Sequence, residues 1–248
     1  MKIFLPLICL CMALTAFSDG RSVDYEVDGE RYEGYFVSPA EDAPLVVLIH
    51  DWEGLTDYEM KRARMLAEAG YAVFAADLFG KGIRPTEMVD RRQHTGELYT
   101  DREKMRRLMR GALAAAEAEG ANTERVVAMG YCFGGAAVLE WARSGDPLKG
   151  FVSFHGGLST PEGQSYAETK APVLIFHGTA DTAIPMEEFV TLAKELDEHD
   201  VPNELITYGG APHAFTVFDS DRYREIPDKR SWARFLDFLS EVFETNAD

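Results

Sequence analysis

Residues 125–135 read Arg-Val-Val-Ala-Met-Gly-Tyr-Cys-Phe-Gly-Gly, and this stretch decides the fold. Its first half is an apolar, partly β-branched run that predicts a strand. Its second half is a Gly-x-Cys-x-Gly turn centred on Cys132, and a β-carbon at Gly130 or Gly134 would crowd such a sharp turn. We therefore predict a nucleophile elbow, in which a strand ends beside Cys132 and a helix begins directly after it.

The predicted position of Cys132 suits a reactive thiol. A side chain on this turn stands above a helix N-terminus, where the helix dipole and unpaired N–H groups favour a thiolate and later an oxyanion. The competing interpretation is a small buried hydrophobic residue, which is the more common role of a free cysteine. The choice depends on whether the chain also supplies an acid and a histidine.

Two further residues supply those groups, each after its own predicted strand. Asp181 comes shortly after the apolar run at 173–176. His213 follows the run at 204–208 and a Gly-Gly-Ala-Pro loop. The carboxyl ends of parallel strands meet at one edge of a sheet, and the order nucleophile, acid, histidine is typical of an α/β-hydrolase. We therefore predict a triad of Cys132, Asp181 and His213.

The chain has 248 residues, of which 46% are hydrophobic, and this suits one large core. Alternating residues predict an antiparallel hairpin of strands 23–27 and 32–37 around Asp28-Gly29. Mostly continuous apolar runs predict buried strands at 45–49, 71–76, 125–129, 151–154, 173–176 and 204–208. Helices are predicted at 57–69, around 100–118, and at 136–143, 186–198 and 230–243. We predict one α/β-hydrolase domain over residues 19–248, with a mostly parallel, doubly covered sheet that starts with the antiparallel hairpin.

The loop after the strand at 45–49 reads His50-Asp51-Trp52-Glu53-Gly54 and falls at the same edge of the sheet. In this fold, the residue after the nucleophile gives one oxyanion-hole N–H, and this loop gives the other. We therefore predict the N–H groups of Trp52 and Phe133 as the two donors. We interpret His50 as a structural polar group and not as a catalytic one.

The first residues differ in character from the rest of the chain. Lys2 precedes an apolar stretch over residues 3–17, and Ala16-Phe17-Ser18 has small residues at both specificity positions of a signal-peptidase site. We expect residues 1–18 to be a cleaved export signal, and the protein to be periplasmic or secreted with no stable membrane insertion. An uncleaved anchor is one alternative, and a lipoprotein is another, although Cys9 and Cys11 lack the small residues that precede a lipidated cysteine. Cleavage would leave Cys132 as the sole cysteine, which excludes an internal disulfide.

The formal net charge of the whole chain is −17, and loss of Lys2 with the leader would make it more negative. This charge argues against nucleic acids and anionic membranes as partners. We interpret the acidic residues, many of them at 187–200, as a solvated face, with an acidic binding patch as the alternative. The histidines at 50, 155 and 177 lack the spacing of a helical zinc pair, so we predict no metal site and no cofactor.

Six short motifs are spread over most of residues 19–248: His50-Asp51-Trp52-Glu53-Gly54-Leu55, the segment 76–82, Gly130-Tyr131-Cys132-Phe133-Gly134-Gly135, Phe154-His155-Gly156, His177-Gly178-Thr179-Ala180-Asp181 and His213-Ala214-Phe215. Together they resemble the dienelactone hydrolase family, the cysteine-dependent branch of the α/β-hydrolases. The resemblance implies that Cys132 is the nucleophile, His213 the base and later the acid, and Asp181 the residue that orients the imidazole.

The resemblance also implies a carboxylate that holds the resting cysteine, and Asp51 occupies that place although the family usually has a longer glutamate. Enzymes of the family that open dienelactones hold the substrate carboxylate with arginines. The matching positions here are Lys81 and the uncharged Val217, so we do not expect a carboxylated lactone as the substrate. Lys81 or the nearby Arg84 could still attract an anion. We expect loops at 81–94 and 158–169 to shape the pocket.

The expected reaction is hydrolysis of a small-molecule ester or lactone through an acyl-thioester. A thioesterase or an acyltransferase would use the same triad and differ only in its pocket and acceptor. A non-catalytic binding protein on the same scaffold would be expected to have lost triad residues, whereas all three are present. We expect a monomer, although nothing in the sequence fixes the oligomeric state.

Overall fold

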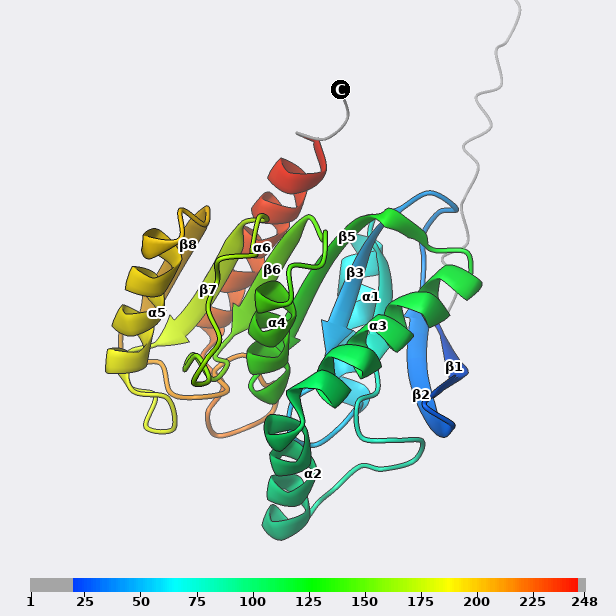
Figure 1. Ribbon diagram of the computed structural model, residues 1–248, viewed down its shortest axis with the longest axis horizontal. Helices are drawn as coiled ribbons and strands as arrows, with labels where there is room; N and C mark the ends of the chain where they lie inside the picture. The colour runs from blue at the N-terminus through cyan, green and yellow to red at the C-terminus, as the bar shows by residue number, and fades with distance from the viewer. Residues whose placement is uncertain (1–19, 245–248) are drawn as a thin grey trace, which may run out of the picture.

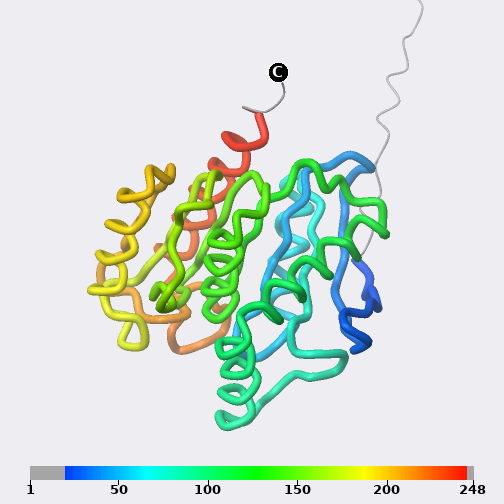
Figure 2. Tube along the Cα trace, in the orientation of Figure 1, coloured from blue at the N-terminus to red at the C-terminus, as the bar shows by residue number. Residues whose placement is uncertain are grey.

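The computed structural model describes residues 20–244, so the expected export signal at 1–18 lies outside the described residues. Within that range, eight strands form one sheet in the order β1-β2-β4-β3-β5-β6-β7-β8 (Figure 1). The strands are β1 (Arg21–Val27), β2 (Glu30–Val37), β3 (Pro44–Ile49), β4 (Ala72–Ala76), β5 (Asn122–Tyr131), β6 (Gly150–Phe154), β7 (Val173–Gly178) and β8 (Asn203–Tyr208). In Figure 2 the described part of the chain begins with β1 at one edge of the sheet, and β8 forms the opposite edge.

The predicted hairpin and the predicted parallel sheet are both present. Asp28 and Gly29 join β1 to β2 with φ angles of 54° and 82°, the left-handed backbone that a tight two-residue hairpin turn requires. β2 then pairs antiparallel with β4. Every pair from β4 through β3 to β8 is parallel. The chain therefore has the predicted α/β-hydrolase architecture.

Residues 20–244 contain six helices: α1 (Asp57–Glu68), α2 (Met88–Thr100), α3 (Arg102–Ala118), α4 (Phe133–Arg143), α5 (Met186–Glu198) and α6 (Glu225–Glu244). Figure 1 shows α3, α4 and α5 in front of the sheet, and α1 and α6 behind it. The buried apolar residues accordingly form two clusters. One contains Leu108, Val138 and Leu192 of the front helices, and the other contains Leu66 and Phe235 of the rear ones. Among the described residues no helix is long and apolar enough to span a bilayer.

Two helices depart from the sequence prediction. The expected loop at 81–94 contains the start of α2, which extends from Met88 to Thr100, and α6 starts at Glu225, before the predicted residue 230. In α2 only Thr95 and Leu98 are buried, so its sequence has no broad apolar stripe that could reveal it. Figure 1 shows α2 beyond the edge of the sheet to which the arrowheads of β3 and β7 point, which places it over the predicted site.

Candidate active site

The chain turns at Cys132 as the sequence predicts. β5 ends at Tyr131, α4 begins at Phe133, and Cys132 lies between them with φ 53° and ψ −113°, a strained conformation for a residue with a side chain. A β-carbon at Gly130 would lie 2.3 Å from the backbone of Gly134, and one at Gly134 would lie 2.2 Å from the carbonyl oxygen of Ile49. The two glycines are therefore required by close backbone contacts that fix the direction of the cysteine side chain.

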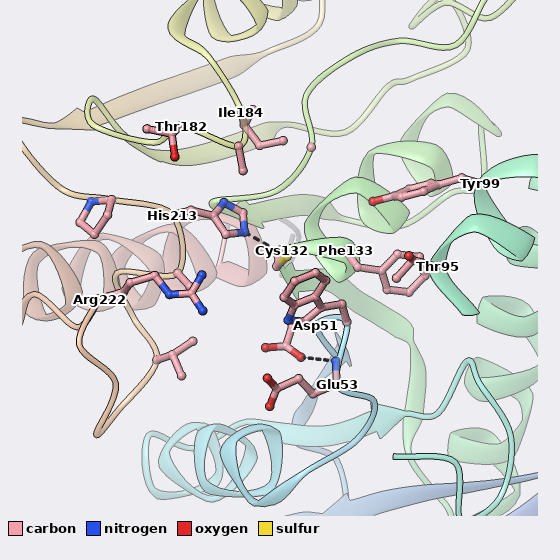
Figure 3. Close-up of a pocket in the computed structure, with 16 residues that line it drawn as sticks. Asp51, Glu53, Thr95, Tyr99, Cys132, Phe133, Thr182, Ile184, His213 and Arg222 are labelled. Atoms are coloured by element: carbon pink, nitrogen blue, oxygen red, sulfur yellow. Dashed lines mark hydrogen bonds between the residues drawn. The ribbon is translucent and has the colours of Figure 1, made fainter. Parts of the chain in front are cut away.

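The thiol of Cys132 faces the imidazole of His213. The Sγ atom lies 3.1 Å from Nε2 of His213, and Cys132 is partly exposed (Figure 3). Burial disfavours a charged imidazole, but the hydrogen bonds to Asp181 and Cys132 outweigh this and raise the pKa of His213 to about 10. His213 is therefore protonated at neutral pH, and an imidazolium beside a sulfur is the environment in which cysteine nucleophiles ionise.

Three hydrogen bonds hold the carboxylate of Asp181. Nδ1 of His213 donates to Oδ2 at 2.8 Å, and the N–H groups of Ala183 and Ile184 donate to Oδ1 at 2.8 and 2.9 Å. The side chain is buried, which acts to raise its pKa, yet these donors prevail and lower the pKa of Asp181. An ionised Asp181 directs the other imidazole nitrogen, Nε2, toward the sulfur.

The segment after His213 is held from beneath by a buried polar network. Thr216 has no exposed surface, and its hydroxyl lies 2.7 Å from the Tyr58 hydroxyl and 2.8 Å from Nε2 of His155. The Arg62 guanidinium donates to the Thr216 carbonyl at 2.7 Å. The ring of His155 also packs edge-on against His213, with 5.3 Å between the ring centroids. No local sequence pattern predicts this network, because its members come from distant elements.

A cavity of about 360 Å³ opens over the thiol, and Figure 3 shows its walls. The lining residues come from six places: the loop after β3, helix α2, the elbow, the loop after β6, the loop after β7 and the segment after β8. They include Asp51, Trp52, Thr95, Tyr99, Cys132, Phe133, Gly157, Ile184, His213, Val217 and Arg222. Cys132, Trp52 and Phe133, which the sequence assigns to the site, therefore border the same space.

The two predicted oxyanion donors are free to donate. Trp52 and Phe133 both line the cavity. Within residues 20–244, neither backbone N–H has an acceptor in the protein. Phe133 is also the first residue of α4, where the helix dipole adds positive potential. Two unpaired N–H groups on the wall of this cavity can stabilise an oxygen anion that forms there.

Asp51 borders the cavity but does not hold the thiol in this structure. Its Oδ1 accepts a hydrogen bond from the Glu53 N–H at 2.7 Å, which shapes the loop that carries Trp52. Burial raises the pKa of Asp51 to about 6, although the bond from Glu53 opposes this shift. Burial also raises the pKa of the neighbouring Glu59 to about 8. The hydrogen bond of the thiol goes to His213, so Asp51 does not act here as the family glutamate is expected to act on a resting cysteine.

Lys81 and Arg84 do not reach the cavity. The Lys81 ammonium is paired with Asp24 of β1 and is 3.8 Å from Glu33 of β2. Arg84 donates to the carbonyl oxygens of Leu55 and Ile83. Neither side chain is among the residues that line the site, so the structure does not place either one where it could orient a substrate. Lys81 and Arg84 lie in or near the motif at 76–82, but their position in the sequence does not show which groups their long side chains contact.

An arginine that the sequence does not predict for the site, Arg222, lines the cavity. Arg222 lies on the segment between His213 and α6, and Figure 3 shows its guanidinium directed toward His213 and Asp51. It has no hydrogen-bond or ion-pair partner within residues 20–244. Val217, the uncharged residue at the family arginine position, also lines the cavity. No sequence signal distinguishes Arg222 from other surface arginines, because its approach depends on the path of the segment.

The buried His50 ring makes hydrogen bonds to the backbone of two loops. Its Nδ1 lies 2.6 Å from the Asp51 carbonyl oxygen, and its Nε2 accepts from the Leu78 N–H at 3.1 Å. Burial lowers the pKa of His50 to about 4, so the ring is neutral and serves the loop structure. Residues 20–244 contain no group of three or more metal-ligating side chains with the geometry of a metal site.

Comparison with known proteins identifies the family. The chain matches the dienelactone hydrolase family over residues 32–243. A Salmonella typhimurium protein provisionally named a carboxymethylenebutenolidase is 26% identical over 227 residues, covering 86% of this chain and 84% of its own. A Bradyrhizobium protein provisionally named a 2-oxo-3-(5-oxofuran-2-ylidene)propanoate lactonase is 25% identical over 229 residues, covering 88% of this chain and 92% of its own.

Solved structures support the same family assignment. A dienelactone hydrolase-like promiscuous phosphotriesterase from metagenomic libraries is 32% identical, with a TM-score of 0.84, and the match covers 90% of this chain and 98% of that one. The family match extends from the first hairpin to the last turn of α6 and includes the elbow, the acid and the histidine. The chain therefore belongs to the dienelactone hydrolase family.

Proposed function

We propose that this ester or lactone hydrolase uses Cys132 as its nucleophile, His213 as its proton carrier and Asp181 as the residue that orients His213. One observation carries the proposal. A partly exposed thiol on a strained turn lies 3.1 Å from an imidazole that a buried carboxylate holds at 2.8 Å, at the floor of a cavity. Strain of this kind is maintained at functional sites, where the surrounding structure enforces it.

In acylation, His213 already holds the proton of Cys132, and the sulfur attacks the carbonyl carbon of the substrate. The carbonyl π electrons move to oxygen, and the N–H groups of Trp52 and Phe133 stabilise the resulting oxyanion. The intermediate then collapses, the bond to the leaving oxygen breaks, and that oxygen takes the proton from Nε2 of His213. The products of this half-reaction are an alcohol and an acyl-thioester on Cys132.

Deacylation repeats these steps with water as the attacking group. His213, neutral after it has protonated the leaving oxygen, removes a proton from water as the water oxygen attacks the thioester. The oxyanion forms in the same place and collapses with release of the sulfur. The acid leaves, and Cys132 and His213 return to their starting state. Protein groups supply every proton transfer in this cycle, and the scheme uses no cofactor.

Two other functions use the same scaffold. A thioesterase or acyltransferase would share the acyl-thioester and differ in the leaving group or acceptor, so product analysis with added alcohols and thiols separates them from a hydrolase. A binding protein would not need the three side chains aligned. The close contacts of both imidazole nitrogens, at 2.8 and 3.1 Å, favour catalysis over binding alone.

The proposal is tested by p-nitrophenyl acetate hydrolysis with wild type and with Cys132→Ser and Cys132→Ala. Both variants should fold and lose at least about a hundredfold in turnover, because a hydroxyl is a far weaker nucleophile and a methyl group is none. Iodoacetamide should abolish wild-type activity in step with one added label, followed by intact mass. Turnover in Cys132→Ala equal to that of wild type would remove Cys132 from the mechanism.

A further inference from the structure

Two side chains of opposite charge line the catalytic cavity without a charged partner. Arg222 has no hydrogen-bond or ion-pair partner within residues 20–244. Oδ1 of Asp51 accepts from the Glu53 N–H, whereas no group in the described part of the chain donates to its Oδ2. Figure 3 shows the Arg222 guanidinium directed toward Asp51. The proposed mechanism uses neither side chain.

The other charged groups that line the cavity are paired within the protein. The carboxylate of Glu53 lies 3.1 Å from the guanidinium of Arg91. The His213 imidazolium is hydrogen-bonded to the other two members of the triad. Among the described residues that line the cavity, Arg222 and Asp51 therefore carry the charges that remain free to contact a bound molecule.

Asp51 provides a fixed acceptor, and Arg222 provides a donor. Asp51 is only 9% exposed, and the hydrogen bond from Glu53 holds its carboxylate in place. Burial raises the pKa of Asp51 to about 6, so the carboxylate is ionised at neutral and alkaline pH. Arg222 is exposed on the segment after His213, and a guanidinium stays charged throughout this range. A group bound between the two side chains meets a negative charge on one side and a positive charge on the other.

This pair of opposite charges favours a hydroxyl group over a charged group. A hydroxyl can donate to a carboxylate and accept from a guanidinium at the same time. An anion would be attracted by Arg222 but repelled by Asp51, and a cation would meet the reverse. Hydrogen bonds to ionised partners are also stronger than those between neutral groups. A neutral molecule with several hydroxyl groups therefore fits the pair best.

The role of His213 indicates which part of a substrate meets this pair. In the proposed mechanism His213 protonates the leaving oxygen, so the alcohol part of an ester lies on the His213 side of Cys132. Figure 3 shows Arg222 on that side of the thiol, whereas Tyr99 lies on the opposite side. The alcohol part of a bound ester would therefore extend toward Arg222 and Asp51.

We propose that Arg222 and Asp51 bind the alcohol part of the substrate, and that the enzyme selects esters of polyols, such as glycerol or a sugar. Free hydroxyl groups of the alcohol part donate to Oδ2 of Asp51 and accept from the guanidinium of Arg222. This inference rests on the proposed function, because it assigns the alcohol side from the role of His213.

Two acetate esters whose alcohol parts have equal carbon chains test the inference: glycerol monoacetate and propyl acetate. Acid release is followed at mildly alkaline pH, where Asp51 is ionised. Wild type should prefer the glycerol ester by about tenfold in kcat/KM, beyond the ratio of the two uncatalysed rates, because only its free hydroxyls bond the charged pair. Arg222→Met should remove most of this preference, since methionine is of similar length and donates no hydrogen bond. Asp51→Asn should also reduce it, because the amide oxygen can still accept from the Glu53 N–H while the amide nitrogen accepts nothing.

Arg230→Met is the matched control and should retain the preference, because Arg230 is exposed on α6 and does not line the cavity. The acetate ester of glycolic acid supplies an anionic alcohol part. A wild-type preference for this anion over both neutral esters, lost in Arg222→Met, would overturn the polyol site in favour of an anion site. An unchanged ratio of the two neutral esters in folded Arg222→Met, with hydrolysis that still depends on Cys132, would overturn the inference and leave the proposed function intact. Loss of the Cys132 dependence itself would overturn both.

Discussion

Cys132 shows how much of the site depends on single residues. Its strained φ of 53° is imposed by Gly130 and Gly134, whose missing side chains allow β5, α4 and the end of β3 to approach each other. The thiol is hydrogen-bonded to His213, which is in turn hydrogen-bonded to Asp181. Asp181 in turn stabilises the positive charge on His213.

The protonation of His213 gives a pH-dependent prediction. In Asp181→Asn the carboxylate that stabilises the imidazolium is removed, so the pKa of His213 should fall from about 10. Because the imidazolium must protonate the leaving oxygen, the alkaline limb of the pH profile should move to lower pH. Turnover should also fall by about a thousandfold, since the imidazole loses its preferred orientation.

The measurement is kcat/KM for p-nitrophenyl acetate against pH, corrected for spontaneous hydrolysis. The exposed Asp237 on α6 provides a matched control, because Asp237→Asn makes the same chemical change away from the cavity. An alkaline limb in the same place for wild type and Asp181→Asn would show that another group titrates there.

Helices α1 and α6 form a support for the catalytic loop. Arg62 of α1 is paired with Asp228 of α6 and donates to the Thr216 carbonyl. Its guanidinium lies 4.1 Å from the ring centroid of Phe218, which fixes it further. Helix α1 is itself held at its start by the capping box of Thr56 and Glu59. The histidine therefore sits on a loop tied to two helices of the rear layer.

Thr216→Val should weaken this support while leaving the volume of the side chain unchanged. The substitution leaves the buried Tyr58 hydroxyl and His155 Nε2 without their partner, which costs about 1–3 kcal/mol for each unsatisfied group. Because His155 packs against His213, we also expect kcat to fall more than KM rises. Urea unfolding and steady-state kinetics measure the two effects.

Thr191→Val in α5 is the comparison variant, since the Thr191 hydroxyl is exposed and bonds only the Glu187 carbonyl in its own helix. A loss of stability at Thr216 no larger than at Thr191 would contradict a structural role for the network. Unchanged kcat in a destabilised Thr216→Val would show that the network supports the fold without positioning His213.

In the whole molecule, the residues of the candidate site lie together at one edge of the sheet. Five parallel strand pairs bring the ends of β3, β5, β7 and β8 to that edge, and their loops carry Trp52, Cys132, Asp181 and His213. Helix α2 covers the edge and adds Tyr99 to the cavity wall. The helices on both faces bury the sheet and keep these loops at fixed distances.

Export is the prediction that concerns the full chain. The apolar stretch over 3–17 and the small residues at 16 and 18 predict that a bacterial host will export the protein and remove residues 1–18. Intact mass of the exported protein should give a chain that starts near Asp19. Ala16→Glu should block processing, because a large charged residue does not fit the signal-peptidase site. A mass that retains Met1 in the exported wild type would indicate an anchor.

The sequence by itself determined the sheet and the places of Cys132, Asp181 and His213 after its strands. Buried strands need continuous apolar runs, and an elbow needs its two glycines, so both leave a local pattern that can be read along the chain. The tertiary structure alone decided that Lys81 pairs with Asp24 and that Arg222 borders the cavity. These outcomes depend on contacts between residues far apart in the chain, and on loop paths that no local periodicity encodes.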